Sequence, residues 1–230
     1  MKAIVLVGST GKMSRILQEL CQEQKLPFKV FSEKASPALQ IKNFSGTKGV
    51  IDFSLPDATE KICRMAIEAN VPYICGTTGW KSKSEIDNLF TEASKKIAVV
   101  KDANFSLGVE ILSEASEILA KALSSELLIT DIHHSQKKDA PSGTALKIEA
   151  RMKKANPKSL VKINSIREGE VFGEHRILAT FEDQTLEFIH RAHSRKPFAS
   201  GALKALEWAS KQKPGLYSMK DVLPVKEIRS

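Results

Sequence analysis

The sequence contains no apolar run approaching the ~20 residues that a membrane-spanning helix needs. Its apolar stretch near the N-terminus, residues 3–7, is shorter than the ~7–15 residues of the apolar part of an export signal. It also lacks low-complexity tracts, and its 42% hydrophobic and 27% charged residues match folded globular proteins. These features predict a soluble, folded protein with no membrane association and no export signal.

Cysteine is scarce. Cys21, Cys63 and Cys75 form no CxxC pair, and an odd number does not make a complete disulfide framework. The spacing also fits no cysteine-based metal site. We therefore expect the protein to work in a reducing cytoplasm.

Aromatic residues make up only 6% of the chain, and no aromatic-interleaved basic strand or zinc-finger spacing accompanies its net charge of +8. The charge is compatible with an anionic partner, but the basic residues are scattered, which favours a lysine-rich solvated surface. Nucleic acid is therefore not an expected partner.

The first 105 residues alternate apolar β-type runs with stretches of helical periodicity. Strands are expected at residues 2–7, 28–31, 49–53, 71–75 and 97–100. Such alternation predicts a doubly wound parallel sheet with right-handed crossovers, a Rossmann-type α/β fold. We take residues 1–105 as a dinucleotide-binding domain.

The turn after the first strand is rich in small residues. Its candidate cofactor contacts are Gly8, Ser9, Thr10, Gly11, Lys12 and Met13. Glycines here let a backbone approach a pyrophosphate at the helix N-terminus. The spacing is G-x-x-G, and Ser14 stands where a further glycine might close the helix against the strand. A plain tight turn is the alternative.

Other small or polar residues follow later strands, where doubly wound sheets bind ligands. Ser54 follows the third strand, where we also expect it to cap the next helix. Glu33 and Lys34 follow the second strand, at the position where dinucleotide-binding folds bind the adenosine ribose. They place an acid and a base side by side. The remaining candidates for this edge are Gly76, Thr77, Thr78, Ala103, Asn104 and Phe105.

The pattern changes after residue 105. A long helix over residues 107–123 precedes a strand, a loop and a helix, and then three strand-like runs at 160–167, 175–181 and 185–192. Consecutive strands predict a mixed or antiparallel sheet. Residues 106–196 therefore form a second, α+β domain, and a helix from Pro197 within residues 197–230 could pack back on the first domain.

Residues 131–146, DIHHSQKKDAPSGTAL, carry most of the chemistry. Asp131 and His133 share one face of a strand, whereas His134 points the other way. Pro141, Ser142, Gly143 and Thr144 begin a helix whose unpaired N–H groups attract anions, such as a carboxylate.

A metallohydrolase built on His133, His134 and Asp131 or Asp139 is a weighed alternative. It is disfavoured because adjacent histidines on a strand diverge and no third ligand has the expected spacing. No metal is expected. His175, His190 and His193 are interpreted as structural, hydrogen-bonded histidines.

Nearly the whole chain resembles the 4-hydroxy-tetrahydrodipicolinate reductase (dihydrodipicolinate reductase) family. The most specific motif is His133-His134-x-x-Lys137-x-Asp139-Ala-Pro-Ser-Gly-Thr144. Asp52-Phe-Ser54, Cys75-Gly-Thr-Thr-Gly79, Ala103-Asn-Phe-Ser106, Gly173-Glu-His175 and the closing residues 215–223 support it. The chain departs from the family at Ser14, a usual glycine, and in the shortened stretch between Arg167 and Gly173.

The resemblance implies roles by position. His133 would be the acid/base residue and Lys137 the proton donor, with His134, Gly143 and Thr144 as substrate contacts, together with Ser142. Residues 8–13, Glu33 with Lys34, 76–78 and 103–105 would hold the cofactor.

The implied reaction is the NADPH- or NADH-dependent reduction of a small cyclic dicarboxylate in diaminopimelate and lysine biosynthesis, with loss of water, by a homotetramer assembled through the second domain's sheet. Glu33 and Lys34 together suggest dual cofactor use, and Lys34 a modest preference for NADPH. The alternative is a nucleotide-binding regulatory module that keeps the fold but has lost catalysis. An intact His133/Lys137 loop argues against it.

Overall fold

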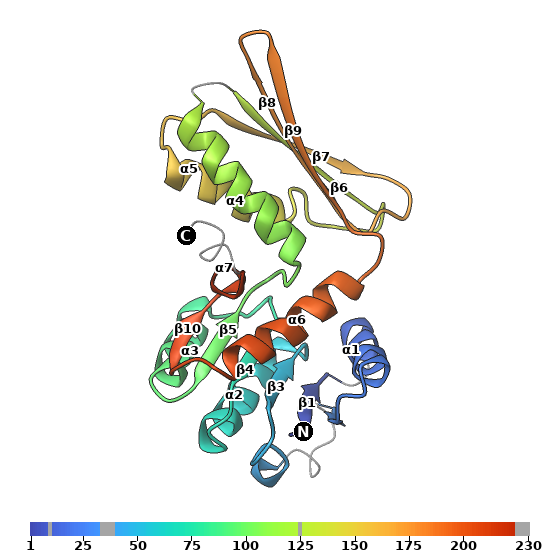
Figure 1. Ribbon diagram of the computed structural model, residues 1–230, viewed down its shortest axis with the longest axis vertical. Coiled ribbons are helices and arrows are strands. Elements are labelled where there is room, and N and C mark those ends of the chain that lie inside the picture. Colours follow the sequence, from blue (N-terminus) through green and yellow to red (C-terminus); the bar gives the residue numbers. More distant parts are fainter. Residues whose placement is uncertain (9–10, 33–39, 124–125, 224–230) are drawn as a thin grey trace. The chain divides into compact units, whose positions relative to one another are not determined.

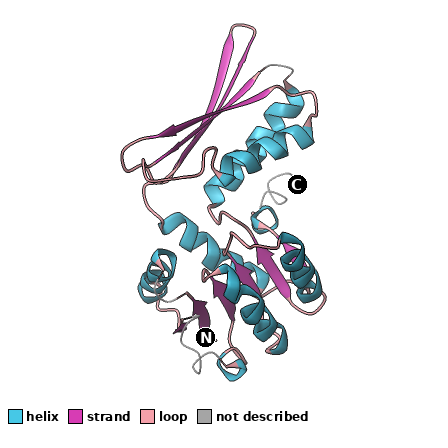
Figure 2. Cartoon of the chain, turned by 180° about the vertical axis from the view of Figure 1, so that it is seen from behind, coloured by secondary structure: helices cyan, strands magenta, loops and turns pink. Residues whose placement is uncertain are grey.

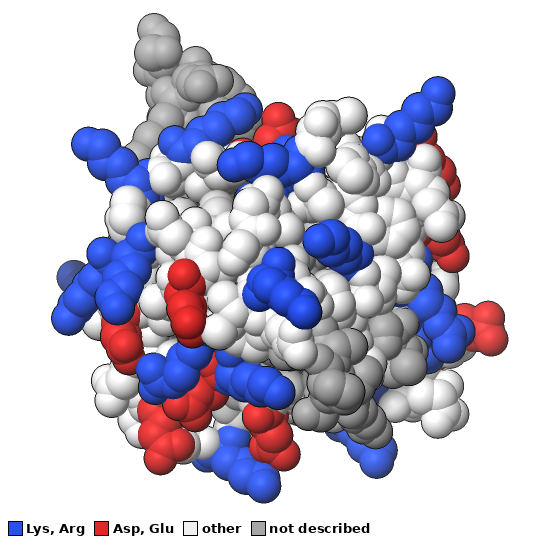
Figure 3. Space-filling view, turned by 90° about the horizontal axis from the view of Figure 1, so that it is seen from below, with Lys and Arg blue, Asp and Glu red and all other residues white. Residues whose placement is uncertain are grey.

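The computed structural model describes residues 1–8, 11–32, 40–123 and 126–223. The chain divides into two compact units, one formed by Met1–Ser106 with Lys196–Ser230 and the other by Leu107–Arg195. Among the described residues, no helix combines the length and apolarity needed to cross a membrane. On the face shown in Figure 3, Lys and Arg are interspersed with Asp, Glu and uncharged residues, as on a solvated surface.

The first unit is built on a six-stranded, entirely parallel sheet in the order β10-β5-β4-β3-β1-β2. The strands are β1 (Ile4–Val7), β2 (Phe28–Phe31), β3 (Gly49–Asp52), β4 (Tyr73–Cys75), β5 (Ala98–Lys101) and β10 (Gly215–Tyr217). β1, β3 and β4 are buried throughout, as expected of a sheet covered on both faces. The predicted parallel, Rossmann-like sheet is confirmed.

Helices cover both faces of this sheet (Figure 1): α1 packs with α6, and α2 with α3. Their bounds are α1 (Lys12–Glu23), α2 (Thr59–Glu68), α3 (Lys83–Ser94), α6 (Lys196–Ala209) and the short α7 (Met219–Val222), with 3-10 turns η1 (Ile41–Asn43) and η2 (Pro56–Ala58). One core cluster lies under α2 and α3 and includes Val50, Ile62, Tyr73 and Phe90.

One expectation for this unit is wrong, and one element was not expected. Ser54 does not cap a helix, because η2 begins at Pro56 and α2 only at Thr59. Residues 215–217 form the edge strand β10, although Pro214-Gly215 in the sequence indicates only the end of a helix. A three-residue strand is too short to show a period of two.

The second unit is a four-stranded mixed sheet in the order β7-β6-β8-β9. Its elements are α4 (Leu107–Ala122), β6 (Leu127–His133), α5 (Gly143–Ala155), β7 (Val161–Arg167), β8 (Glu174–Phe181) and β9 (Gln184–Arg191). β6 runs parallel to β7 and antiparallel to β8, as the predicted α+β domain with a mixed sheet requires. Figure 2 shows α4 and α5 side by side along one face of the four strands.

The core of the second unit lies between these helices and that face. Leu127 and Ile129 of β6 are fully buried there, as are Ile148 and Met152 of α5. Because side chains alternate along a strand, Asp131 and His133 continue the same row as Leu127 and Ile129. The apolar core therefore gives way to polar residues toward the end of β6.

Candidate functional site

The turns after four strands of the first unit lie at the same level of the sheet. Val7 pairs with Asp52, Asp52 with Cys75, and Cys75 with Lys101, so the residues that follow each of them come together at the carboxyl edge. Of the predicted cofactor contacts, this edge holds Gly8, Gly11, Lys12, Met13, Gly76, Thr77, Thr78, Ala103, Asn104 and Phe105. Ser9, Thr10, Glu33 and Lys34 lie outside the described residues.

Two glycines at this edge have no room for a side chain. A Cβ on Gly8, whose φ is +105°, would lie 2.5 Å from the carbonyl oxygen of Phe53, and a Cβ on Gly76 would lie 2.1 Å from the Phe53 ring. Gly11 precedes α1 without a side-chain cap, so that helix presents its first N–H groups uncapped. The two glycines let these turns pack closely on Phe53, and the uncapped N–H groups of α1 could hold a dinucleotide phosphate.

Ser14, the residue that departs from the family pattern, is 1% exposed on the inner side of α1. Its hydroxyl accepts a hydrogen bond from the Gln18 amide at 3.4 Å. A serine is thus accommodated where helix and sheet meet.

Asp52 connects the turns after β3 and β4. Its Oδ1 accepts hydrogen bonds from the Ser54 N–H at 2.8 Å and from the Thr77 hydroxyl at 3.4 Å, and its Oδ2 from the Tyr73 hydroxyl at 2.5 Å. Burial raises the pKa of the Asp52 carboxyl, although these hydrogen bonds act in the opposite direction. Thr77 is consequently held inside, whereas Thr78 is exposed.

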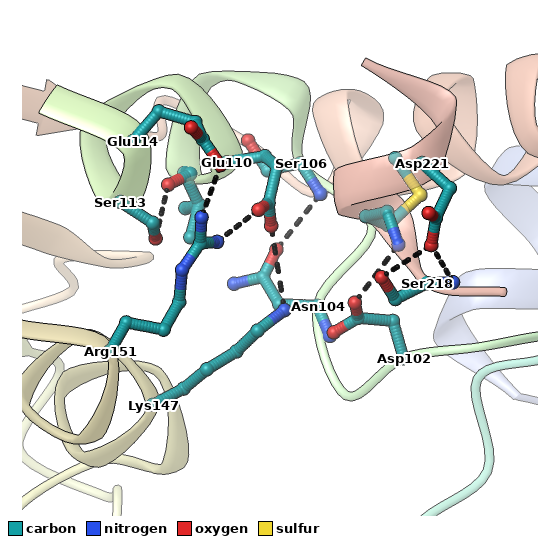
Figure 4. A network of polar contacts seen from close by, with 12 residues as sticks. Asp102, Asn104, Ser106, Glu110, Ser113, Glu114, Lys147, Arg151, Ser218 and Asp221 are labelled. Atoms are coloured by element: carbon teal, nitrogen blue, oxygen red, sulfur yellow. Dashed lines mark hydrogen bonds and ion pairs between the residues drawn. The ribbon is translucent and has the colours of Figure 1, made fainter. Parts of the chain in front are cut away.

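The turn after β5 is held by side chain to backbone bonds (Figure 4). Asp102 accepts from the Asn104 N–H at 3.2 Å and from the Met219 N–H at 3.2 Å, and Asn104 Oδ1 accepts from the Ser106 N–H at 2.8 Å. Ala103 is exposed, while Phe105 is 1% exposed and packs edge-on against Phe53. Phe105 therefore shapes this edge from beneath.

In the second unit, the predicted catalytic loop joins β6 to α5. His133 ends β6 and is buried, and His134 is half-buried. Lys137 lies in a turn closed by its N–H to the His134 carbonyl at 3.0 Å, and its Nζ is 2.7 Å from Asp139 Oδ1. The Asp139 side chain is 58% exposed, so this ion pair is easily exchanged for another anion.

The loop ends at the capped start of α5. The Ser142 hydroxyl accepts from the Ala145 N–H at 3.2 Å, and Ser142 itself is buried. Gly143 is exposed and Thr144 half-buried at the first turn, and a Cβ on Gly143 would meet no atom within 4 Å. The first turn of α5 is thus open to a ligand.

The shortened connection between β7 and β8 holds this loop in place. The Glu168 N–H donates to the His133 carbonyl at 2.9 Å, the His134 N–H to the Val171 carbonyl at 2.7 Å, and the Ser135 N–H to the Gly169 carbonyl at 3.2 Å. Although short, the connection binds the backbone on both sides of His134.

Asp131 is surrounded by partners. It is fully buried beside His133, His175, Ser142 and Arg167. Burial by itself raises the pKa of its carboxyl, but the hydrogen bonds from Ser142 and the close ring nitrogens of His133 and His175 outweigh that effect and hold the pKa far below its usual range. The carboxylate stays ionised.

Sequence reasoning did not connect His175 or Arg167 with this site. β8 places His175 opposite Asp131, and β7 places Arg167 beside His133. The Gly173-Glu-His175 motif was the available signal, but only the strand register identifies its neighbours.

The register also corrects the argument used against a metal. In the described residues, the ligand atoms of Asp131, His133 and His175 lie within 4.8 Å of one another, so a third ligand does exist. However, the Arg167 guanidinium lies 2.9 Å from Asp131 and already supplies the positive charge. The arrangement is that of a hydrogen-bonded carboxylate with a cationic partner.

The three cysteines are buried, free thiols. Burial raises the pKa of Cys21 to about 11 and is the main cause that raises the pKa of Cys63 to about 12. Since the thiolate is the nucleophile, these thiols are unsuited to covalent catalysis at neutral pH.

Comparison with known proteins agrees with this arrangement. Residues 2–105 match the family model described as dihydrodipicolinate reductase, N-terminus, and residues 108–223 the one described as dihydrodipicolinate reductase, C-terminus. The 4-hydroxy-tetrahydrodipicolinate reductase of Bdellovibrio bacteriovorus is 38% identical over 220 residues, which cover 96% of this chain and 95% of that protein. The enzyme of the same name from Wolinella succinogenes is 35% identical over 258 residues, which cover 98% of this chain and 100% of that protein.

Solved structures show the same fold. The dipicolinate-bound dihydrodipicolinate reductase from Paenisporosarcina sp. TG-14 superposes with a TM-score of 0.78 at 19% identity, covering 97% of this chain and 100% of that one. A myo-inositol dehydrogenase from Corynebacterium glutamicum gives 0.62 at 11% identity, covering 99% and 94%. From the two family models and the near full-length relatives, the chain belongs to the dihydrodipicolinate reductase family, a family of oxidoreductases.

Proposed function

We propose that this chain reduces 4-hydroxy-tetrahydrodipicolinate to tetrahydrodipicolinate in diaminopimelate and lysine biosynthesis, consuming one NAD(P)H and one proton and releasing water. The observation that carries this proposal is the loop joining β6 to α5, which holds His133, Lys137 and an open helix start within a family of reductases. A bound reduced nicotinamide would supply the hydride.

The cofactor would lie on the carboxyl edge of the first unit's sheet. The uncapped start of α1 and the strand ends that meet at this edge support this placement. Lys12, Met13, Thr78, Ala103 and Asn104 would border it. Dual use of NADPH and NADH, with a modest preference for NADPH through Lys34, remains part of the proposal.

The substrate would bind at the loop of the second unit. One ring carboxylate would lie on the N–H groups of Gly143 and Thr144, with the Thr144 hydroxyl beside it, because a helix N-terminus favours an anion by ~0.3–2 kcal/mol. Ser142 would contribute by fixing this helix start, and His134 would border the ring.

His133 would act as the acid/base residue and Lys137 as the proton donor. Lys137 can release the exposed Asp139 and take a substrate carboxylate or deliver its proton, since an exposed ion pair is worth only ~0.2–1 kcal/mol. Lys137→Ala should therefore lower kcat and raise KM, whereas an increase in KM alone would reduce Lys137 to a binding residue.

We further propose a cytoplasmic homotetramer that assembles through the second unit's sheet. The assembly is supported by Ile189 of β9, which is 50% exposed on the sheet face away from α4 and α5, and the cytoplasmic location by the three free cysteines. Sedimentation equilibrium of the wild type against Ile189→Lys would test the assembly.

The deciding experiment is a coupled assay with freshly made substrate that follows nicotinamide oxidation with each cofactor. Turnover abolished by His133→Ala supports the proposal. A chain that binds the dinucleotide but oxidises none would instead be the nucleotide-binding regulatory module.

A further inference from the structure

Asp131 lies two residues before His133 in β6, on the side of the strand that faces the helices, and its side chain has no exposed surface. Nothing in the proposed chemistry requires an ionised carboxylate at this depth. A buried charge is costly unless it is paired and hydrogen-bonded, so its neighbours indicate what it does.

The two oxygens of Asp131 have separate partners. Oδ1 lies 3.0 Å from His133 Nδ1, 2.7 Å from the Ser142 hydroxyl and 3.3 Å from His175 Nε2. Oδ2 accepts the Ser142 N–H at 2.8 Å and the Arg167 guanidinium at 2.9 Å. Arg167 balances the charge, His175 reaches in from β8, and His133 and Ser142 stand at the two ends of the proposed catalytic loop.

The contact with His133 determines which of its nitrogens can exchange a proton. The Asp131 carboxylate lies 3.0 Å from Nδ1, in a direction outside that of a well-formed hydrogen bond, and its negative charge favours the neutral tautomer that carries the hydrogen on Nδ1. Nε2 is then the exchanging atom. It faces Gly173, where an added Cβ would lie 3.1 Å from it, so the glycine leaves room around this atom.

The contact with Ser142 fixes the start of α5. The hydroxyl that donates to Asp131 also accepts the Ala145 N–H at 3.2 Å, and the Ser142 N–H is bound to the same carboxylate. One carboxylate therefore holds both the imidazole of His133 and the helix end where Gly143 is exposed.

We infer that Asp131 is a positioning residue, which holds His133 in its Nδ1–H tautomer and fixes the first turn of α5. It thereby keeps constant the distance between the His133 imidazole and the substrate carboxylate bound at that turn. This inference rests on the proposed function. Asp131 acts through His133 and Ser142 and touches no substrate atom itself.

The test compares Asp131→Asn, His133→Ala and the double variant in the coupled assay. Asp131→Asn is nearly isosteric, but its amide cannot accept on both sides. We expect it to lower kcat by about 10²-fold, within the range of a mispositioned acid/base group. In the His133→Ala background the same substitution should change kcat less than about threefold, because the effect of Asp131 on kcat goes through His133. Its effect through Ser142 on the helix start should persist there as a raised substrate KM.

Glu174→Gln is the matched control. Glu174 is also buried and paired with arginines, Arg176 at 2.5 Å and Arg191. It is the register partner of Ile132, so it lies on the opposite face of the sheet from Asp131. Its kcat should stay within about threefold of wild type, whatever its effect on Tm.

Two further readouts separate positioning from folding. The pH profile of kcat/KM should move in Asp131→Asn, since the charge beside the imidazole is gone, and should not move in Glu174→Gln. Nitrogen NMR of the wild type, with the His133 signals assigned by difference from His133→Ala, should show Nδ1 protonated in the neutral ring. The NMR measurement stands even if Asp131→Asn fails to fold.

Three results would each overturn the inference while leaving the reductase assignment standing. They are an equal loss of kcat from Asp131→Asn with and without His133, an unmoved pH profile of kcat/KM, and a neutral His133 protonated on Nε2. A wild type that turns over no substrate with either cofactor would instead remove the proposed function, and this inference with it.

Discussion

Replacing Arg151 by methionine should destabilise the second unit. Arg151 lies on α5 with its side chain 14% exposed, and its guanidinium pairs with Glu110 and Glu114 of α4 (Figure 4). It also pairs with Glu117 of the same helix. Glu110 is 1% exposed, so the substitution leaves a buried carboxylate without its main partner.

Breaking a buried ion pair costs about 3–5 kcal/mol. Lys147 Nζ stays 3.4 Å from Glu110 and keeps part of the compensation, which places Arg151→Met at the lower end, about 3 kcal/mol. With a urea dependence of about 1–3 kcal/mol/M, the unfolding midpoint should fall by about 1–3 M.

The assay is urea unfolding followed by far-UV circular dichroism, with Lys153→Met as control. Lys153 is on the same helix, but its pair with Glu149 is exposed, so its loss should stay within about 1 kcal/mol. Glu110→Gln in the Arg151→Met background should recover part of the loss. A loss below about 1 kcal/mol, or strict additivity of the two substitutions, would refute this reasoning.

The remaining predictions concern Gly173, Lys34 and Asp131. Gly173→Ala should lower kcat with little change in cofactor affinity, because the added Cβ would lie 3.1 Å from His133 Nε2. Steady-state kinetics and a dinucleotide titration measure the two quantities, and an unchanged kcat would refute the prediction. Lys34→Ala should lower kcat/KM with NADPH more than with NADH, and this difference should be smaller at high salt because salt screens the charge of Lys34. If only kcat/KM with NADH falls, another residue binds the 2′-phosphate. Asp131 has a depressed folded pKa, so its stabilisation is present above the unfolded value of about 3.9 and is lost as pH falls below it. The urea midpoint of Asp131→Asn should therefore fall less than that of wild type between pH 5 and pH 3, and parallel curves would contradict this.

The sequence by itself determined the succession of elements and much of their chemistry. Alternating strands and helices predicted the parallel sheet, and consecutive strands after residue 160 predicted the mixed one; both are confirmed. The period of two in β6 placed Asp131 and His133 on one face, as their 3.0 Å contact shows. Such patterns can be read locally, because backbone geometry fixes which neighbours share a face.

Tertiary structure alone decided what lies opposite those residues. His175 and Arg167 reach Asp131 through the registers of β8 and β7, and a shift of one residue would turn either side chain to the other face. The edge strand β10 likewise exists because β5 offers it a partner, not because three residues show a pattern. Pairing between distant segments is set by the packing of the whole unit, and for that reason the sequence revealed the loop of His133 and Lys137 but not the carboxylate network behind it.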